Sequence, residues 1–216
     1  MTWFETKRGK DLLQLEQNIL DQLFDHLFGY NIIQIGAHRS LINNSRFKYK
    51  YTNQQIRYKP DGLPFENDSI DCIVLPHQDI DDGQIISEVY RTLIPHGHAI
   101  FINFNPWSPI GIRTFFSLSS EEPWNQNLES FTSFQNKILN YDFEIVNGKF
   151  FGYHPSFKSA SNLSNWDKIG DRWFPLFANI YLIVARKKII TLTPIKPSWK
   201  GNIQKNQVKV KSKYEI

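Results

Sequence analysis

The sequence predicts an α/β fold in which a mostly parallel sheet carries helices on both faces. Two short segments, 31–35 (NIIQI) and 69–75 (SIDCIVL), are apolar at successive positions, as in strands that are covered on both sides. Amphipathic helical patterns occupy 9–28 and 82–93. Because helices alternate with doubly buried strands along the chain, we expect parallel strands joined by helical crossovers.

The first predicted element is an amphipathic helix over 9–28 that ends at Gly29. Its apolar residues recur mostly every three or four positions, with Glu16 and three aspartates between them. The apolar positions are Leu12, Leu13, Leu15, Ile19, Leu20, Leu23, Phe24 and Leu27. A strand over 31–35 follows, and Gly36 closes it.

Two shorter extended pieces are predicted near 47–51 and 55–58, before a turn at 60–62 (PDG). The strand over 69–75 comes next and should stop at Pro76, which lacks a backbone N–H donor.

The helix over 82–93 places Ile85, Ile86, Val89, Tyr90 and Leu93 on one face, and 94–98 (IPHGH) reads as a tight turn into a strand over 99–103. Further strands are predicted at 142–146 and 180–186. In open parallel sheets, ligands bind at the carboxyl ends of the strands. The loops after Ile35, Tyr58, Leu75 and Asn103 should therefore meet at one crevice.

Composition limits the classes of protein and site. The chain has 216 residues and is 41% hydrophobic, which is enough for a substantial core. Its single cysteine, Cys72, excludes an intramolecular disulfide, and no His/Cys cluster has zinc-ligand spacing, so we predict no metal site. No run reaches the ~18 apolar residues of a membrane span, and no export signal is recognised. We expect a cytoplasmic protein that does not enter membranes.

Positive charge gathers at the end of the sequence. The segment 187–216 holds eight lysines and one acid, a net charge of +7 in a chain whose total is +4, so 1–186 carries −3. We expect a globular domain over 1–186 and a basic, flexible tail over 187–216. The tail either aids solubility or tethers RNA or another polyanion.

Two stretches resemble class I S-adenosylmethionine-dependent methyltransferases: 63–77 (LPFENDSIDCIVLPH) and 88–106 (EVYRTLIPHGHAIFINFNP). In that family an LPF-x-x-x-S-h-D segment enters the fourth strand, and an R-x-L-h-P-G-G turn leads into the fifth. The likeness covers roughly 29–186. It is greatest to a small bacterial branch of type 11-like proteins with F-N-P-x-S-x-x-G-x-R after the fifth strand, matched by 104–113, and a late L-I-V-A-R-K strand, matched by 182–187.

The resemblance implies a Rossmann-like, seven-stranded, mostly parallel sheet with one antiparallel strand, 180–186, and helices on both faces. It also implies a cofactor, S-adenosyl-L-methionine, and places its binding site at three loops. The implied cofactor-binding residues are Gly36, Ala37, His38, Asp61, Gly62, Leu63, Pro76 and His77.

The chain departs from the family at the cofactor loops. The family has an acid and then Gly-x-Gly-x-Gly after the first strand, whereas here Gln34 stands at the acid's position and Gly36 is the one glycine kept. No acid lies between Phe47 and Gln55, where the ribose would be bound. Lys59 occupies a further acidic position, and Asp61 could replace that acid or could simply form a turn.

Other side chains near the implied site admit more than one interpretation. His77 could be a general base, could line the cofactor pocket, or could be a surface histidine. Asn105 and Arg113 suit a substrate-side lid with Trp107, Phe115 and Phe116 as packing or stacking groups. Asp71 matches a structural acid of the family.

Two functions remain open from the sequence. One is a methyltransferase of unknown acceptor, because methyl transfer from a sulfonium mainly requires alignment of the nucleophile. The alternative is an inactive methyltransferase-like protein that acts as a binding or scaffold partner. RNA association through the basic tail is compatible with either.

Overall fold

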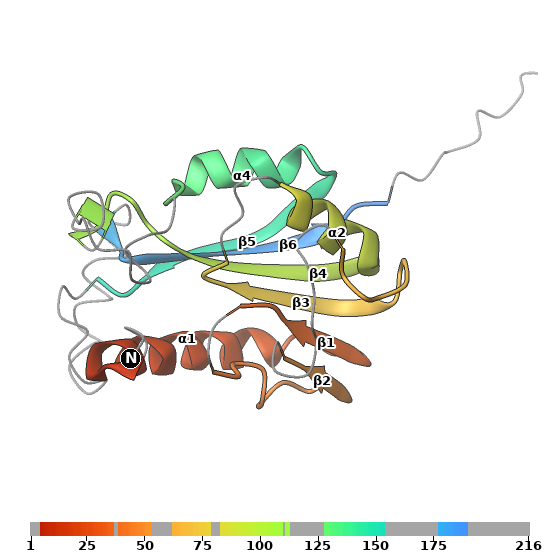
Figure 1. Cartoon of the computed structure of the whole chain (residues 1–216), viewed down its shortest axis with the longest axis horizontal. Coiled ribbons are helices and arrows are strands. Elements are labelled where there is room, and N and C mark those ends of the chain that lie inside the picture. Colours follow the sequence, from red (N-terminus) through yellow and green to blue (C-terminus); the bar gives the residue numbers. More distant parts are fainter. Residues whose placement is uncertain are drawn as a thin grey trace, which may run out of the picture.

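In a computed structural model of the protein, the described residues form one six-stranded sheet with helices packed on both faces (Figure 1). The structure describes residues 5–36, 39–52, 62–78, 83–109, 111–112, 128–153 and 177–189. The helices are α1 (Lys7–Phe24), α2 (Gln84–Thr92) and α4 (Phe131–Leu139). The strands are β1 (Asn31–Gln34), β2 (Tyr49–Tyr51), β3 (Ile70–Pro76), β4 (Leu93–Phe104), β5 (Phe143–Phe151) and β6 (Ile180–Lys187).

The strand order is β2-β1-β3-β4-β6-β5. β2, β1, β3 and β4 pair in parallel, as the doubly apolar strands predicted. Two pairings are antiparallel, and both involve β6, which runs against β4 on one side and β5 on the other. The seven strands implied by the family resemblance are not confirmed, since the described part of the chain forms six.

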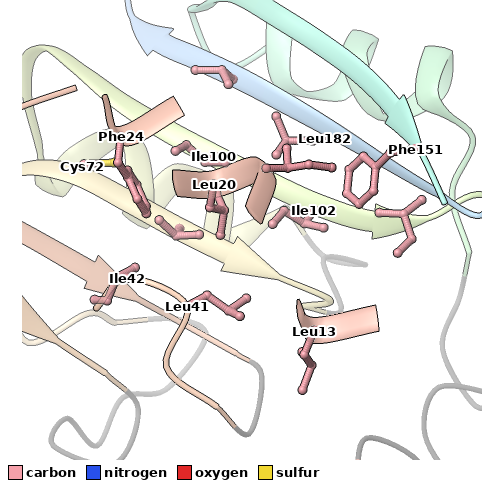
Figure 2. Packing of buried hydrophobic residues seen from close by; sticks show 14 of the residues in the cluster. Leu13, Leu20, Phe24, Leu41, Ile42, Cys72, Ile100, Ile102, Phe151 and Leu182 are labelled. Carbon is pink, nitrogen blue, oxygen red and sulfur yellow. The ribbon is translucent and has the colours of Figure 1, made fainter. Parts of the chain in front are cut away.

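Helix α1 covers one face of the sheet. Leu12, Leu20 and Phe24 of this helix are almost completely buried. Figure 2 shows side chains of α1 gathered with those of β3, β4 and β6 in a single cluster. Leu41 and Ile42, from the connection between β1 and β2, complete this core beside the helix. No helix forms among the described residues of that connection, so α1 provides the helical cover here.

The opposite face is covered by α2 and α4 (Figure 1). Neighbouring strand residues alternate between the two cores: Ile73 and Phe101 face α2 and α4, whereas Cys72 and Ile100 face α1. Helix α4 was not predicted, although Phe134 and Ile138 have helical spacing and are buried. Ser130 caps this helix by accepting a hydrogen bond from Ser133 N.

Several predicted boundaries need correction. Helix α1 starts before Gly9 because Thr6 Oγ1 accepts from Gly9 N, and it ends at Phe24, four residues before the predicted end. The predicted turn at 94–98 is wrong, since β4 is continuous from Leu93. A register shift between Ile70 and Cys72 and the left-handed backbone of His96 (φ 63°) accommodate the extra residues within the strand.

The two ends of β3 also differ from expectation. The strand was predicted to stop before Pro76, but Pro76 is its last residue. The next backbone N–H, from His77, donates to Ile102 O at 2.7 Å. At the other end, Asp71 Oδ2 accepts from Asn31 N at 2.8 Å, in agreement with a structural role for this acid.

No helix in the described part of the chain is long and apolar enough to cross a membrane.

The remaining predictions about chain organisation lie at the margins of the described residues. The strand expected at 55–58 falls outside them, as does the tail from residue 190 onward. The domain boundary expected at 186/187 falls at the end of β6, where Lys187 Nζ bonds Asp68 Oδ1 (2.7 Å) and Leu93 O (2.8 Å). Lys187 therefore belongs structurally with the sheet.

Candidate active site

The candidate site lies where β1, β3 and β4 end side by side. Gln34 pairs with Val74, and Pro76 pairs with Ile102, so the carboxyl ends of the three parallel strands share one edge of the sheet. From β1 the order runs to β2 on one side and to β3 on the other. This reversal is the switch point at which open α/β sheets bind ligands.

Gly36 brings the loop after β1 against the loop after β3. Its φ is +95°, a backbone conformation that residues other than glycine rarely adopt. A Cβ at this position would lie 2.6 Å from Pro76 O and 3.1 Å from Gln78 Oε1. Glycine is therefore required both by the backbone and by the close approach. Ala37 and His38, the next predicted cofactor contacts, lie outside the described residues.

Gln34 takes over the acid's position and binds the loop itself. Its Nε2 donates to Gly36 O (3.1 Å) and Arg39 O (2.8 Å), and its Oε1 accepts from Leu41 N (2.7 Å). The side chain is 2% exposed. Its amide thus stabilises the course of the loop, whereas the family's acid is directed toward the cofactor. The Arg39 side chain is exposed.

A second glutamine, which the sequence did not single out, completes this arrangement. Gln17 of α1 donates from Nε2 to Leu41 O at 2.9 Å and to Asp21 Oδ1 at 2.7 Å. Both backbone groups of Leu41 are therefore held by glutamine amides, one from β1 and one from α1. The sequence signal for this contact was a polar residue on the buried face of an amphipathic helix.

The described part of the loop before β3 begins at Gly62. Gly62 is exposed, and Asp61 lies outside the described residues. Leu63 is 5% exposed and packs in the core that faces α2. Its backbone N donates to Glu88 Oε2 at 2.8 Å, and its backbone O accepts from Arg91 at 3.1 Å. In this arrangement Leu63 anchors the loop.

Arg91 joins the two stretches that carry the family resemblance. Its guanidinium pairs with Glu88 (2.8 Å) and donates to Phe65 O and Asn67 Oδ1. The hydrogen bond from Arg91 lowers the pKa of Glu88, and the same bond raises the pKa of the guanidinium. The LPF segment and the R-x-L segment thus form one structural unit.

His77 forms the most buried polar contact at this edge. Its Nε2 lies 2.6 Å from Oε1 of Glu16, and the two side chains are 2% and 0% exposed. The His77 backbone is left-handed (φ 51°), and its ring stacks on Phe104 with centroids 4.3 Å apart. The interpretation of His77 as a surface histidine is therefore wrong.

Glu16 was predicted as a polar residue between the apolar positions of α1, but it is fully buried. The signal was present in the spacing. Leu12, Leu13, Ile19 and Leu20 lie three or four residues on either side of Glu16, which places it on the same helical face.

Asn105 uses its side chain to hold the chain after β4. Its Nδ2 donates to Ala178 O at 2.9 Å, and its Oδ1 accepts from Trp107 N at 3.2 Å. Ser108 Oγ donates to Asn105 O and accepts from Gly111 N, and a Cβ at Gly111 would meet the carbonyls of Asn105 and Pro106. The residues of the F-N-P-x-S-x-x-G pattern therefore form a turn that is held by hydrogen bonds among themselves.

The substrate contact of Asn105 stays a prediction. Arg113, Phe115 and Phe116 lie outside the described residues, and Trp107 is 65% exposed beside the turn. Among the residues that the structure describes, no group of three or more His, Cys, Asp or Glu side chains could hold a metal ion.

As a candidate S-adenosyl-L-methionine site, this edge keeps one of the glycines at which the family's main chain comes close to the cofactor. At Gly36 the loops after β1 and β3 approach so closely that a Cβ would meet Pro76 O at 2.6 Å, so a cofactor at this edge would lie against the main chain of both loops. The carboxylates are different: Gln34 replaces one, and no acid lies between Tyr49 and Thr52 at the end of β2.

Comparisons with known proteins identify the fold. No family model matches the sequence, and no curated protein matches it. Among solved structures, a SAM-dependent methyltransferase from Archaeoglobus fulgidus aligns with a TM-score of 0.58 at 13% identity, over 81% of this chain and 94% of that one.

Two more solved structures agree. A SAM-dependent methyltransferase from Thermotoga maritima, described as a possible histamine N-methyltransferase, aligns with a TM-score of 0.56 at 15% identity, over 82% of this chain and 89% of that one. Geranyl diphosphate C-methyltransferase from Streptomyces coelicolor aligns with a TM-score of 0.55 at 11% identity, over 85% and 87%. The chain has a class I SAM-dependent methyltransferase-like fold.

Proposed function

We propose that the protein binds S-adenosyl-L-methionine at the carboxyl edge of β1 and β3 and transfers its methyl group to an acceptor that is not yet identified. The observation that carries this proposal is Gly36, which keeps a left-handed backbone in contact with Pro76 O at the switch point of the sheet. Solved structures with this fold include a methyltransferase crystallised with S-adenosyl-L-homocysteine.

The chemistry demands few catalytic groups. The cofactor supplies an activated methyl group on a sulfonium, so the protein contributes binding, alignment and removal of water. The loops after β1 and β3 would hold the methionyl and adenosyl parts, and the turn at Asn105 would border the acceptor. Loss of the family's acids therefore weakens the contacts to the cofactor without removing the chemistry.

Isothermal titration with S-adenosyl-L-methionine and S-adenosyl-L-homocysteine tests the proposal. We expect saturable heat from both ligands with wild-type protein, and at least tenfold weaker binding to Gly36→Ala, whose new Cβ would contact Pro76 O. Gln14→Glu, an exposed change on α1, serves as a control and should bind like wild type. No heat from either ligand at high concentration would overturn the proposal.

A protein that kept the fold as a scaffold is the second candidate. It is favoured by Gln34, whose amide is committed to Gly36, Arg39 and Leu41. In that case wild-type protein would bind neither ligand, and Gly36→Ala would alter stability alone. The same titrations, combined with urea denaturation, separate the two candidates.

Association with RNA or another polyanion through the basic tail is a further proposal. It depends on the net charge of +7 over 187–216. Since Lys187 bonds Asp68 and Leu93, a test should change only lysines beyond residue 189. Replacing those six lysines by glutamine should lower affinity for a single-stranded RNA and flatten its salt dependence. Unchanged, salt-insensitive retention would exclude the tether.

A further inference from the structure

We infer that the edge of the sheet where β1 and β2 begin is a binding surface for single-stranded nucleic acid. Exposed aromatic rings would stack on bases, and two lysines would contact phosphates. We call it the amino-edge surface, and it consists of Phe28, Tyr30, Lys48, Tyr49 and Lys50. It lies at the start of these strands, away from the candidate active site at their carboxyl ends, so its role does not depend on methyl transfer.

The aromatic side chains of this surface are open to solvent. Phe28 is 83% exposed, Tyr30 66% and Tyr49 47%. Their segments lie side by side, because Tyr49 N donates to Tyr30 O at 2.7 Å and Lys48 N donates to Gly29 O at 3.4 Å. Large rings that stay in water gain little stability from folding. A contiguous group of exposed aromatic residues is typical of an interaction site.

Positive charge accompanies the rings. Lys48 is exposed, and its Nζ lies 5.1 Å from the centroid of the Tyr49 ring. Lys50 follows two positions later, and residues two apart on a strand point to the same face, so the two ammonium groups share one side of β2. The surface thus places two cations next to three open rings.

Two carboxylates beside this surface already have partners. Asp25 pairs with Arg46 at 3.1 Å, and Asp71, which lies against Gly29, accepts a hydrogen bond from Asn31 N at 2.8 Å. In the described part of the chain, neither carboxylate forms an ion pair with the two lysines. Ammonium groups and rings in this combination suit the phosphates and bases of a single strand.

A nucleic acid fits this edge better than a strand of another protein chain. β2 is an outer strand of the sheet and has three residues. Short edge strands that carry lysines disfavour pairing with a strand of another chain. A single-stranded nucleic acid needs no such pairing, because its bases stack on the rings while its phosphates meet the ammonium groups. Stacking tolerates any base, so we expect little sequence preference.

The basic segment of the chain begins at the same edge. Because β1, β3 and β4 run in parallel, their first residues share one edge of the sheet (Figure 1). Lys187, the last residue of β6, bonds the carbonyl of Leu93, the first residue of β4. The six lysines after residue 189 therefore follow from the edge that carries the rings. Their charge would raise the local concentration of a strand that the rings then hold.

The experiment measures the fluorescence anisotropy of two labelled strands of about 12 nucleotides. One is oligouridylate, and the other is an abasic strand, which keeps the phosphates and lacks the bases. Two variants of the full chain are compared with wild type. The aromatic variant combines Phe28→Ser with Tyr30→Ser and changes no charge, and the lysine variant combines Lys48→Gln with Lys50→Gln.

We expect wild type to bind oligouridylate at least tenfold more tightly than the abasic strand. The aromatic variant should lose this preference and bind the abasic strand within about twofold of wild type, because only stacking is removed. The lysine variant should bind both strands more weakly, and the slope of log affinity against log salt should become shallower by roughly 0.7 per lysine.

Matched controls lie far from the surface. Leu139→Ser replaces an exposed apolar residue on α4, and Lys149→Gln removes an exposed lysine on β5, the outer strand at the other side of the sheet. Both should bind the two strands like wild type. An aromatic variant that keeps the preference for oligouridylate, or a wild type that binds both strands equally or neither, would overturn the inference.

Two further outcomes would overturn it by assigning the surface or the binding elsewhere. If only replacement of the six lysines after residue 189 weakens binding, the basic segment alone is the tether. Sedimentation velocity reports self-association of the same proteins. A wild-type dimer that the aromatic variant dissociates, with unchanged oligouridylate binding, would assign the amino-edge surface to a second copy of the chain.

Discussion

Replacing Gln34 by glutamate restores the residue type that the family has after its first strand, yet we expect it to destabilise this protein. The amide Nε2 donates to two backbone carbonyls, of Gly36 and Arg39, and a carboxylate can donate to neither. Only the bond accepted from Leu41 N would survive. The variant therefore places negative charge beside two carbonyl oxygens in a buried position.

The expected loss follows from these contacts. Each lost hydrogen bond is worth ~1 kcal/mol net, and leaving buried acceptors unsatisfied adds to it, so we expect about 2–4 kcal/mol at neutral pH. This corresponds to a melting temperature lower by about 5–15 °C in a chain of this size. Burial and the nearby carbonyls would raise the pKa of the new carboxyl group above its unfolded value.

The pH dependence has a definite sign. A group whose pKa is raised on folding gives its full contribution below the unfolded pKa, about 4.3 for glutamate, and loses it as pH rises. The protonated acid can also donate one hydrogen bond. The destabilisation by Gln34→Glu should therefore be smallest near pH 4 and grow toward pH 8.

Urea denaturation followed by far-UV circular dichroism across this pH range measures the effect. Gln14→Glu makes the same chemical change at an exposed position of α1, where Nε2 donates only to Asn18 at 3.2 Å, and should stay within about 0.5 kcal/mol of wild type. Equal stability of the two variants at every pH would refute the structural role assigned to Gln34.

Three further predictions concern stability and reactivity. In urea denaturation, Gly36→Ala should lower the free energy of unfolding by about 2–4 kcal/mol, because the glycine has a φ of +95° and a Cβ would lie 2.6 Å from Pro76 O. Gly62→Ala is the control and should change the free energy little, because its Cβ meets no described atom within 4 Å. Similar losses in both variants would contradict this prediction. Arg91→Gln should lower the free energy of unfolding by about 1–3 kcal/mol at neutral pH. The difference from wild type should become smaller in acid, because the lowered pKa of Glu88 gives stability above its unfolded pKa that is lost as pH falls. If urea denaturation gives the same difference at every pH, the Glu88–Arg91 pair is not its cause. Cys72 is buried and its pKa is raised by burial, so a thiol reagent should label it only on unfolding, and fast labelling of native protein would be inconsistent with the packing.

The sequence predicted the layers of the fold better than their boundaries. Doubly apolar strands predicted the parallel pairing of β1 and β3, since this pattern depends only on burial of both faces. The turn predicted at 94–98 failed because Pro95 and Gly97 normally interrupt strands, and a register shift far from them in the sequence absorbs the irregularity in β4. Such a compensation involves another strand and leaves no local signal.

The site was predicted in position but not in its contacts. The strand ends identified the edge, and His77 was singled out, but its partner Glu16 lies 61 residues earlier on a helix expected to expose it. Gln34 was recognised as a replacement, yet its role became clear only from the bonds to Gly36, Arg39 and Leu41. Long-range pairs of this kind depend on the packing of α1 against the sheet.

The reversed direction of β6 determines where the basic segment leaves the domain. Ile180 lies beside Phe104 at the edge of the candidate site, whereas Lys187 bonds Asp68 and Leu93 at the opposite edge. Eight strand residues span about 25 Å, so Lys187 lies roughly that far from Ile180. A polyanion captured beside Lys187 would therefore meet the domain on the side away from the edge of Gly36 and His77. Since residues 190–216 can extend up to about 90 Å, lysines farther along this segment could bring such a molecule round to the edge of Gly36 and His77.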